Sequence, residues 1–325
     1  MFTHKDIENR TIFVIHCLHD RNLKVSNGEL LLEDTGENAK KKVLTKIPFQ
    51  KVLALFITGP ISITTPLLDK CKYHNVALVV TKFNLRPVFY WSNCAEGNFL
   101  LRRRQYLLDK NDISIAKLLV ANKLTNQWTL LKNTRERNKA VMYAREQLET
   151  TLAKLPSIKE YNTLLSAEGN AAKLFFGAYF QKFNWQGRKP RTKIDFINTT
   201  LDIGYSILFN FVECFVRMFG FDIYIGVYHR LWFRRKSLIC DLIEPFRCII
   251  EHTVRSALSR EIITKEDFNN YNGEYKLKHE RCGDYYRMFY DALIPHKGDV
   301  FEFVREYYRS FMSETQTRKY PQFLI

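Results

Sequence analysis

The sequence predicts an α+β protein, with an N-terminal β-rich domain similar to a β-sandwich and a larger all-α C-terminal domain. Short runs of β-branched and aromatic residues fill 11–92, whereas helical periodicity begins after residue 97. A chain of 325 residues exceeds one typical domain, and a hydrophobic content of 46% can form substantial cores. We therefore expect domains at 1–94 and 95–325.

The N-terminal region is expected to form short strands with one helix. Asn27-Gly28 separates the apolar runs 23–25 and 30–32. This dipeptide predicts a β-hairpin, because a type I′ turn needs positive φ at both central residues. The segment 66–74 is expected to be a short helix between strands. The expected strands lie within 11–18, 23–34, 51–58, 61–65, 76–81 and 86–91.

Helices are expected from the domain boundary, between Ser92 and Gly97, to residue 312. Asp195 and Asn198 lie where a side chain caps the start of a long apolar helix. Mixed charge in 135–155 is typical of a solvated or partner-facing helix. The expected helices include 99–108, the segment after Asn111-Asp112, 135–155, 158–183, 194–219 and 300–312.

The charge balance indicates a polyanionic partner. The net charge is +16, which fits either nucleic acid or an anionic membrane surface. Charged residues interrupt the most apolar region, 203–228, so we expect no membrane span, and 1–10 lacks the apolar segment of a secretory signal. The cysteines form no C-x-x-C pair, which indicates reduced thiols in a cytoplasmic protein.

The segment 226–252 holds a candidate site. It contains His229, then the cations Arg234 to Lys236, and then Asp241 and Glu244, which share one face if the run is a continuous helix. Two acids and a histidine beside a cationic loop are what a divalent metal acting on phosphate needs. A solvated acidic helix edge with an unrelated histidine explains the spacing equally well.

Glu168 is a third acid of interest. It lies among small residues, which permit close approach of another helix and would enclose the carboxylate. An enclosed acid pairs with a cation or binds a metal, and both interpretations stay open. Tyr205, in the long apolar helix, belongs either to the core or to a site.

Taken in order, several motifs carry a resemblance to a known family. They are E-G-N-A at 168–171, R-x-x-x-D-F-x-N at 191–198, G-F-D-x-Y-x-G-x-x-H at 220–229 and S-L-I-C-D-L-I-E-P-F-R at 237–247. The run 47–59, followed by T-T-P-L-L-D-K-C at 64–71, extends the match over nearly the whole chain. Together they resemble the CRISPR-associated Cas-one integrase family, the enzymes of spacer acquisition.

The resemblance implies a site and an assembly. The implied metal ligands are Glu168, His229 and Glu244, with Asp241 as a nearby catalytic acid, and the implied ion is Mg²⁺ or Mn²⁺. The N-terminal domain would serve dimerisation, and a companion Cas-two dimer would bridge two homodimers in a prokaryotic cytoplasm. Residues 230–233 depart from the family, which often has smaller residues there.

The implied reaction is transesterification, in which 3′-OH ends of prespacer DNA join a strand at the CRISPR leader–repeat. With water as the nucleophile the same site would act as an endonuclease. A stand-alone structure-specific nuclease and a non-catalytic DNA-binding scaffold are the alternatives. The cations expected to contact duplex DNA are Arg102, Arg103, Arg104, Lys173, Arg188, Lys189, Arg191, Arg234, Arg235, Lys236 and Arg247.

Overall fold

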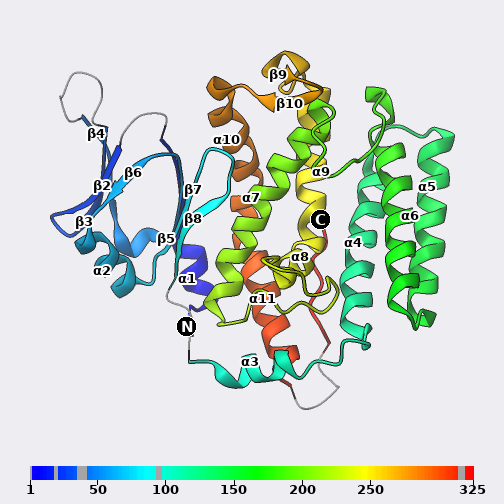
Figure 1. Cartoon of the computed structure of the whole chain (residues 1–325), viewed down its shortest axis with the longest axis horizontal. Helices are drawn as coiled ribbons and strands as arrows, with labels where there is room; N and C mark the ends of the chain where they lie inside the picture. The colour runs from blue at the N-terminus through cyan, green and yellow to red at the C-terminus, as the bar shows by residue number, and fades with distance from the viewer. Residues whose placement is uncertain (1, 18–20, 35–41, 93–96, 314–318) are drawn as a thin grey trace.

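The computed structural model describes residues 2–17, 21–34, 42–92, 97–313 and 319–325. The chain forms two four-stranded sheets followed by a larger helical region (Figure 1). This arrangement confirms the expected α+β class. The expected boundary between residues 94 and 95 falls outside the described residues.

The first sheet has the order β1-β5-β7-β8, and its bounds are β1 Thr11–His16, β5 Val52–Thr58, β7 Ala77–Thr81 and β8 Pro87–Trp91. The second has the order β4-β3-β2-β6, with β2 Arg21–Ser26, β3 Glu29–Asp34, β4 Lys42–Pro48 and β6 Ile61–Ile63. The predicted hairpin is confirmed, since β2 and β3 pair antiparallel across Asn27 and Gly28, both at positive φ. Strand β4 was not expected.

One core lies between the two sheets and α2 (Thr65–His74), where Leu23, Leu30, Leu55 and Leu78 pack together. The other face of the first sheet packs against the helices. There Phe56 of β5 stacks near Phe211, with ring centroids 6.1 Å apart. Every residue of β5 is therefore buried, which explains its continuous apolar sequence.

The helical region is built around α7 (Phe196–Met218), which is almost entirely buried. The carboxylate of Asp195 caps it by accepting the backbone N–H of Asn198, as expected. Figure 1 shows α4, α5 and α6 side by side on one flank of α7 and α9. The helices are α1 His4–Asn9, α3 Phe99–Tyr106, α4 Ser114–Asn133, α5 Lys139–Lys154, α6 Tyr161–Tyr179, α8 Ser237–Leu242, α9 Arg247–Ser259, α10 Cys282–Leu293 and α11 Lys297–Met312.

The helical region also contains a small hairpin, so the expectation of an all-α C-terminal domain was too simple. Strands β9 (Phe268–Tyr271) and β10 (Glu274–Leu277) pair antiparallel across Asn272 and Gly273. Both turn residues have positive φ, as in a type I′ turn. No helix in the described part of the chain is long and apolar enough to cross a membrane.

Candidate metal and DNA site

The loop before α8 is fixed by the carboxylate of Asp241. This fully buried group accepts the backbone N–H groups of Val227, Tyr228 and His229 at 2.6, 3.0 and 2.8 Å. It also accepts a hydrogen bond from Nδ1 of His229 at 2.7 Å. Asp241 therefore fixes both the backbone of this loop and the orientation of the imidazole ring. It leaves Nε2 as the ring nitrogen suited to a metal.

Gly226 lies against the same carboxylate. A Cβ atom at this position would stand 2.5 Å from Oδ2 of Asp241 and 2.9 Å from the backbone carbon of Ser237. Both distances are shorter than a carbon atom can accept. The G-x-x-H spacing therefore has a steric reason, because only glycine lets the loop reach Asp241.

Glu244 does not share a helix with Asp241, which corrects the expected continuous helical face. Helix α8 ends at Leu242, and Glu244 begins a short 3-10 turn, Glu244–Phe246, that contains Pro245. Proline cannot donate a backbone hydrogen bond or continue the α-helix without steric conflict. The turn directs the buried Glu244 side chain toward α4 and α9.

Two cations hold Glu244 ionised. Nε of Arg247 lies 2.9 Å and Nζ of Lys123 lies 2.8 Å from its Oε2 atom. Burial raises the pKa of the Glu244 carboxyl, but the Arg247 guanidinium and the Lys123 ammonium outweigh burial and lower that pKa to about 2. The expected contact between Arg247 and Glu244 is present.

Lys123 also forms an ion pair with Glu168. Glu168 is on α6 and Lys123 on α4, and these two helices pack against each other. Gly169 is exposed and a Cβ atom there would meet no atom within 4 Å, so this glycine is not what lets the helices approach. The hydroxyl of Tyr228 lies 3.5 Å from the other Glu168 oxygen. The two predicted ligands Glu168 and Glu244 thus meet at one ammonium group.

Sequence reasoning did not select Lys123 as a site residue. The sequence feature that could have identified it is a cluster of polar residues in this helix, in which Lys123 lies close to Asn122, Asn126 and Gln127. All four side chains are buried, and buried polar groups of this kind need specific partners. Burial lowers the pKa of Lys123, but Glu244 and Glu168 outweigh burial and raise it, so this lysine is charged.

The donor set fits a divalent ion. Two carboxylates and one imidazole nitrogen are ligands that Mg²⁺ and Mn²⁺ accept. Among the described residues, however, no three His, Cys, Asp or Glu side chains are grouped closely enough to hold a metal as they stand. The point where Glu168 and Glu244 converge is filled by the ammonium of Lys123.

Tyr205 belongs to the core beside the site. Its hydroxyl donates to Glu251 at 3.0 Å, and Gln127 donates to the same carboxylate oxygen at 3.3 Å. Burial raises the pKa of Glu251. The guanidinium of Arg247 lies 4.7 Å from the centre of the Tyr205 ring, so this network is in contact with the arginine that pairs with Glu244.

Several cations expected to contact DNA have structural partners within the protein. Arg102 and Arg104 donate to backbone carbonyls of Gly220 and of Met312 and Ser313. Arg188 pairs with Asp202 at 2.5 Å, and Lys236 pairs with the buried Glu213 at 2.7 Å. Arg235 holds the carbonyl of Arg230 at the base of its own loop. Arg247, which was also expected to contact DNA, is held by its ion pair with Glu244. The other five predicted cations are the more accessible group.

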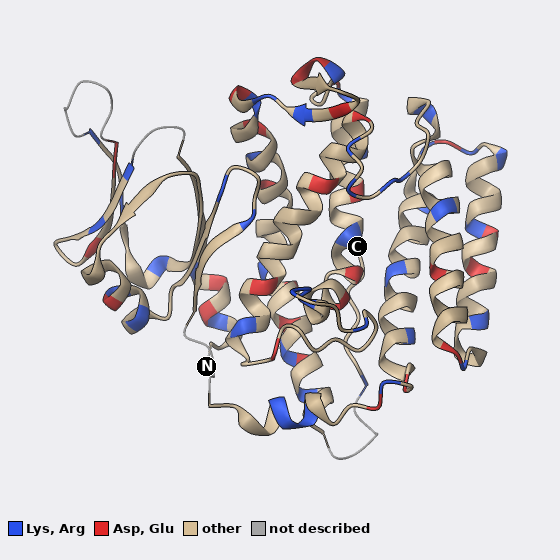
Figure 2. Ribbon diagram, in the orientation of Figure 1, with Lys and Arg blue, Asp and Glu red and all other residues tan. Residues whose placement is uncertain are grey.

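The accessible cations are exposed on separate elements. They are Arg103 on α3, Lys173 on α6, Lys189 and Arg191 before α7, and Arg234 in the loop before α8. Figure 2 shows Lys and Arg over both regions of the protein, with one group on α3. Their contact with DNA stays a prediction.

The loop between His229 and α8 carries exposed aromatic side chains. Trp232 and Phe233 are 74% and 82% exposed. A turn closes the loop, since the N–H of Arg235 donates to the carbonyl of Trp232 at 3.0 Å, and the hydroxyl of Ser237 holds the carbonyl of Arg230 at 3.2 Å. These hydrogen bonds hold the loop that follows His229, and the loop exposes the two aromatic rings to solvent.

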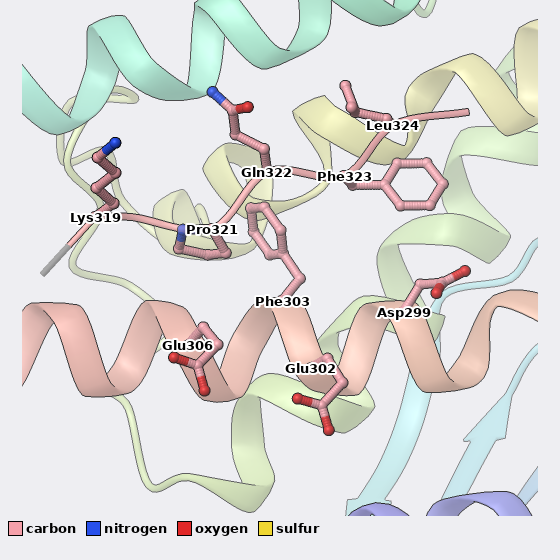
Figure 3. A pocket seen from close by; sticks show the side chains of 9 residues that line it. All are labelled: Asp299, Glu302, Phe303, Glu306, Lys319, Pro321, Gln322, Phe323 and Leu324. Carbon is pink, nitrogen blue, oxygen red and sulfur yellow. The ribbon is translucent and has the colours of Figure 1, made fainter.

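A separate pocket of about 370 Å³ lies between α11 and the C-terminal segment (Figure 3). Its lining includes the carboxylates of Asp299, Glu302 and Glu306, and none of the candidate site residues lines it. Phe323 of that segment is buried, and its backbone is bound on both sides by the amide of Asn122. The pocket is thus distinct from the site around Glu244.

Comparisons with known proteins agree with the fold and with the family resemblance. The model of the family "CRISPR associated protein Cas1" matches residues 17–290. CRISPR-associated endonuclease Cas1 1 of Archaeoglobus fulgidus is 27% identical over 279 residues, which cover 77% of this chain and 79% of that protein. Its namesake from Pyrobaculum aerophilum is 30% identical over 233 residues, covering 69% and 75%.

Solved structures with the same fold are more distant in sequence. A casposase bound to integration product has a TM-score of 0.74 at 18% identity, with 96% of this chain and 94% of that chain covered. A Cas1 protein from Thermotoga maritima has a TM-score of 0.74 at 17% identity, with 93% and 98% covered. A Cas6-RT-Cas1–Cas2 complex has a TM-score of 0.75 at 18% identity, with 98% of this chain and 36% of that chain covered. From the family match over most of its length, this chain belongs to the CRISPR-associated Cas1 family.

Proposed function

We propose that this protein is a metal-dependent DNA integrase of CRISPR adaptation, which joins the 3′-OH ends of prespacer DNA to the CRISPR repeat. One observation carries the proposal: Glu168 and Glu244, from separate elements, converge on one cation, while Asp241 fixes the nearby His229. Family membership and relatives named as endonucleases support the nuclease chemistry. The structural neighbour bound to an integration product supports strand transfer.

Glu168, Glu244 and Nε2 of His229 would hold Mg²⁺ or Mn²⁺. Bound there, the ion supplies a Lewis acid for the scissile phosphate. Asp241 takes the Nδ1 side of the His229 ring, which leaves Nε2 as the nitrogen that would coordinate the ion. Arg247 would orient the Glu244 carboxylate through their ion pair.

The reaction exchanges one phosphodiester bond for another. The 3′-hydroxyl of the prespacer loses its proton and its oxygen bonds to phosphorus, while the bond from phosphorus to a 3′ oxygen of the target strand breaks. That leaving oxygen gains a proton, so no net proton is consumed or released. No external energy source is needed. Water in place of the 3′-hydroxyl gives hydrolysis, which is the endonuclease activity.

The proposed partners are duplex DNA, a second copy of the chain and a Cas2 dimer that bridges two Cas1 dimers. The solved complexes whose titles name Cas1 and Cas2 support the last of these. The exposed cations Arg103, Lys173, Lys189, Arg191 and Arg234 are available for phosphate contact. Such contacts predict that duplex affinity falls steeply with salt.

The decisive experiment is strand transfer into supercoiled DNA carrying a CRISPR repeat, with and without Mn²⁺ and with and without the Cas2 partner. We expect Glu244→Gln to abolish transfer while duplex binding is retained, because the isosteric amide loses the metal ligand. Glu146→Gln, at an exposed position on α5, is the matched control. Transfer that survives Glu244→Gln would contradict the metal assignment.

The same assay separates the alternatives. Cleavage of branched DNA without any transfer product would favour a stand-alone nuclease. Duplex binding with neither transfer nor cleavage, in the wild type under every metal condition, would favour a non-catalytic scaffold.

A further inference from the structure

Lys123 is a buried lysine placed between two predicted metal ligands. Its side chain is 9% exposed, and it reaches the site from α4, which contributes none of the predicted ligands. Its ammonium contacts Glu168 and lies 2.8 Å from Oε2 of Glu244. A single nitrogen atom thus bridges carboxylates from α6 and from the turn after α8.

The ammonium of Lys123 offsets the repulsion between the two carboxylates. Glu244 is 3% exposed, and two carboxylates brought together away from water repel each other unless a cation lies between them. Of these two acids Arg247 pairs with Glu244, whereas Lys123 pairs with both. Lys123 is therefore the group that keeps the two carboxylates together when no metal is bound.

A metal and this ammonium compete for the same oxygens. Mg²⁺ binds carboxylate oxygens at about 2.0–2.1 Å, and the charge of a divalent ion there and that of an ammonium in contact with the same oxygens repel strongly. The position at which Glu168 and Glu244 converge is the position of the lysine nitrogen. A lysine suits such a role, because its ammonium is a point charge on a flexible stem, unlike the rigid fork of arginine.

We propose that Lys123 is a positioning residue that holds Glu168 and Glu244 in the metal-free protein and withdraws from them when the metal binds. The proposal rests on the metal site of the proposed function. Metal binding is then an exchange of one internal cation for another, and the ligands are kept in place before the ion arrives.

The test measures Mn²⁺ binding to the full-length protein by isothermal titration calorimetry, together with the melting temperature with and without Mn²⁺. We expect Lys123→Met to bind Mn²⁺ about tenfold more tightly than the wild type, because no ion pair must be broken. We also expect the variant to melt at a lower temperature than the wild type without metal. Its melting temperature should rise more than that of the wild type when Mn²⁺ is added. Lys139→Met, which removes an exposed lysine from α5, should match the wild type.

A chemical measurement on the wild type covers the case in which Lys123→Met does not fold. Acetylation of Lys123 by an N-hydroxysuccinimide ester, followed by mass spectrometry, should be slow without metal and faster with Mn²⁺. Labelling of Lys173 should not change. Equal labelling of Lys123 with and without Mn²⁺ would overturn the exchange.

The outcomes distinguish this inference from the proposed function. Wild-type protein that binds Mn²⁺, with Glu244→Gln losing that binding and Lys123→Met keeping or weakening it, would overturn the exchange alone. Wild-type protein that binds no Mn²⁺ would overturn the metal-dependent function and the exchange together.

Discussion

Nδ1 of His229 lies 2.7 Å from Oδ1 of Asp241, and the same carboxylate binds three consecutive backbone N–H groups. One buried acid thus sets the fold of the loop and the tautomer of the histidine. Asp241 is a positioning residue for His229, whereas sequence reasoning had counted it among the catalytic acids. Its role in the reaction remains a prediction.

Asp241→Asn is expected to weaken Mn²⁺ binding about 10- to 100-fold, as changes in the partners of metal-bound histidines do. The amide offers one acceptor oxygen in place of two, so its NH₂ group must face backbone or ring donors. Titration calorimetry measures the affinity, and circular dichroism checks the fold. An unchanged Mn²⁺ Kd would contradict the role of Asp241.

Gly226→Ala is expected to displace the His229 loop, because the new Cβ would stand 2.5 Å from Oδ2 of Asp241. We expect lower thermal stability and loss of strand transfer. Gly177→Ala on α6 is the matched control, since its Cβ would meet no atom within 4 Å, and alanine there is expected to gain up to about 1 kcal/mol in helix propensity. Equal behaviour of the two variants would contradict the steric explanation.

Lys236 and Arg234 are expected to behave differently although they are close in sequence. Lys236 pairs with Glu213, which is fully buried, so Lys236→Met should lower the free energy of unfolding by about 1.5–3 kcal/mol. Exposed Arg234→Met should leave stability unchanged and weaken duplex DNA binding at low salt. Urea unfolding and fluorescence anisotropy measure the two effects. The reverse pattern would contradict these assignments.

Trp232 and Phe233 are expected to contact unpaired bases near the site. Base stacking on aromatic side chains contributes about 1–3 kcal/mol per base. Replacing both with serine should therefore weaken binding of a duplex with 3′ overhangs and leave blunt-duplex binding nearly unchanged. Competition anisotropy with the two DNAs measures the difference, and an equal loss for both would argue against stacking.

The ion pairs of Glu244 predict a dependence of stability on pH. Its folded-state pKa of about 2 lies below the ordinary value of 4.5, so its contribution is fully present above pH about 4.5 and is lost as pH falls toward about 2. Glu244→Gln lacks this contribution. The difference in unfolding free energy between wild type and variant should shrink as pH falls from about 4.5 to about 2, as urea titrations would measure. A difference that stayed constant over this range would mean that Arg247 and Lys123 do not lower the pKa of Glu244.

Local sequence patterns predicted the elements whose causes are local. Asn27-Gly28 gave the hairpin, and Asp195 gave the start of α7, because a turn or cap depends on a few adjacent residues. The same Asn-Gly signal is present at 272–273, and applying it there would have found the second hairpin. Pro245 also indicated that the helix is interrupted there, but the apolar spacing around it favoured a continuous helix.

The sequence by itself determined the chemical inventory of the site, namely two glutamates, a histidine and an aspartate in the order of the family motifs. Only the tertiary structure decided that Lys123 joins Glu168 to Glu244, and that Arg102, Arg104, Arg188 and Lys236 hold structural partners. The physical reason is the distance along the chain over which each interaction acts. A motif fixes residues within about a turn of one another, whereas the partner of a buried charge is set by which helices pack together.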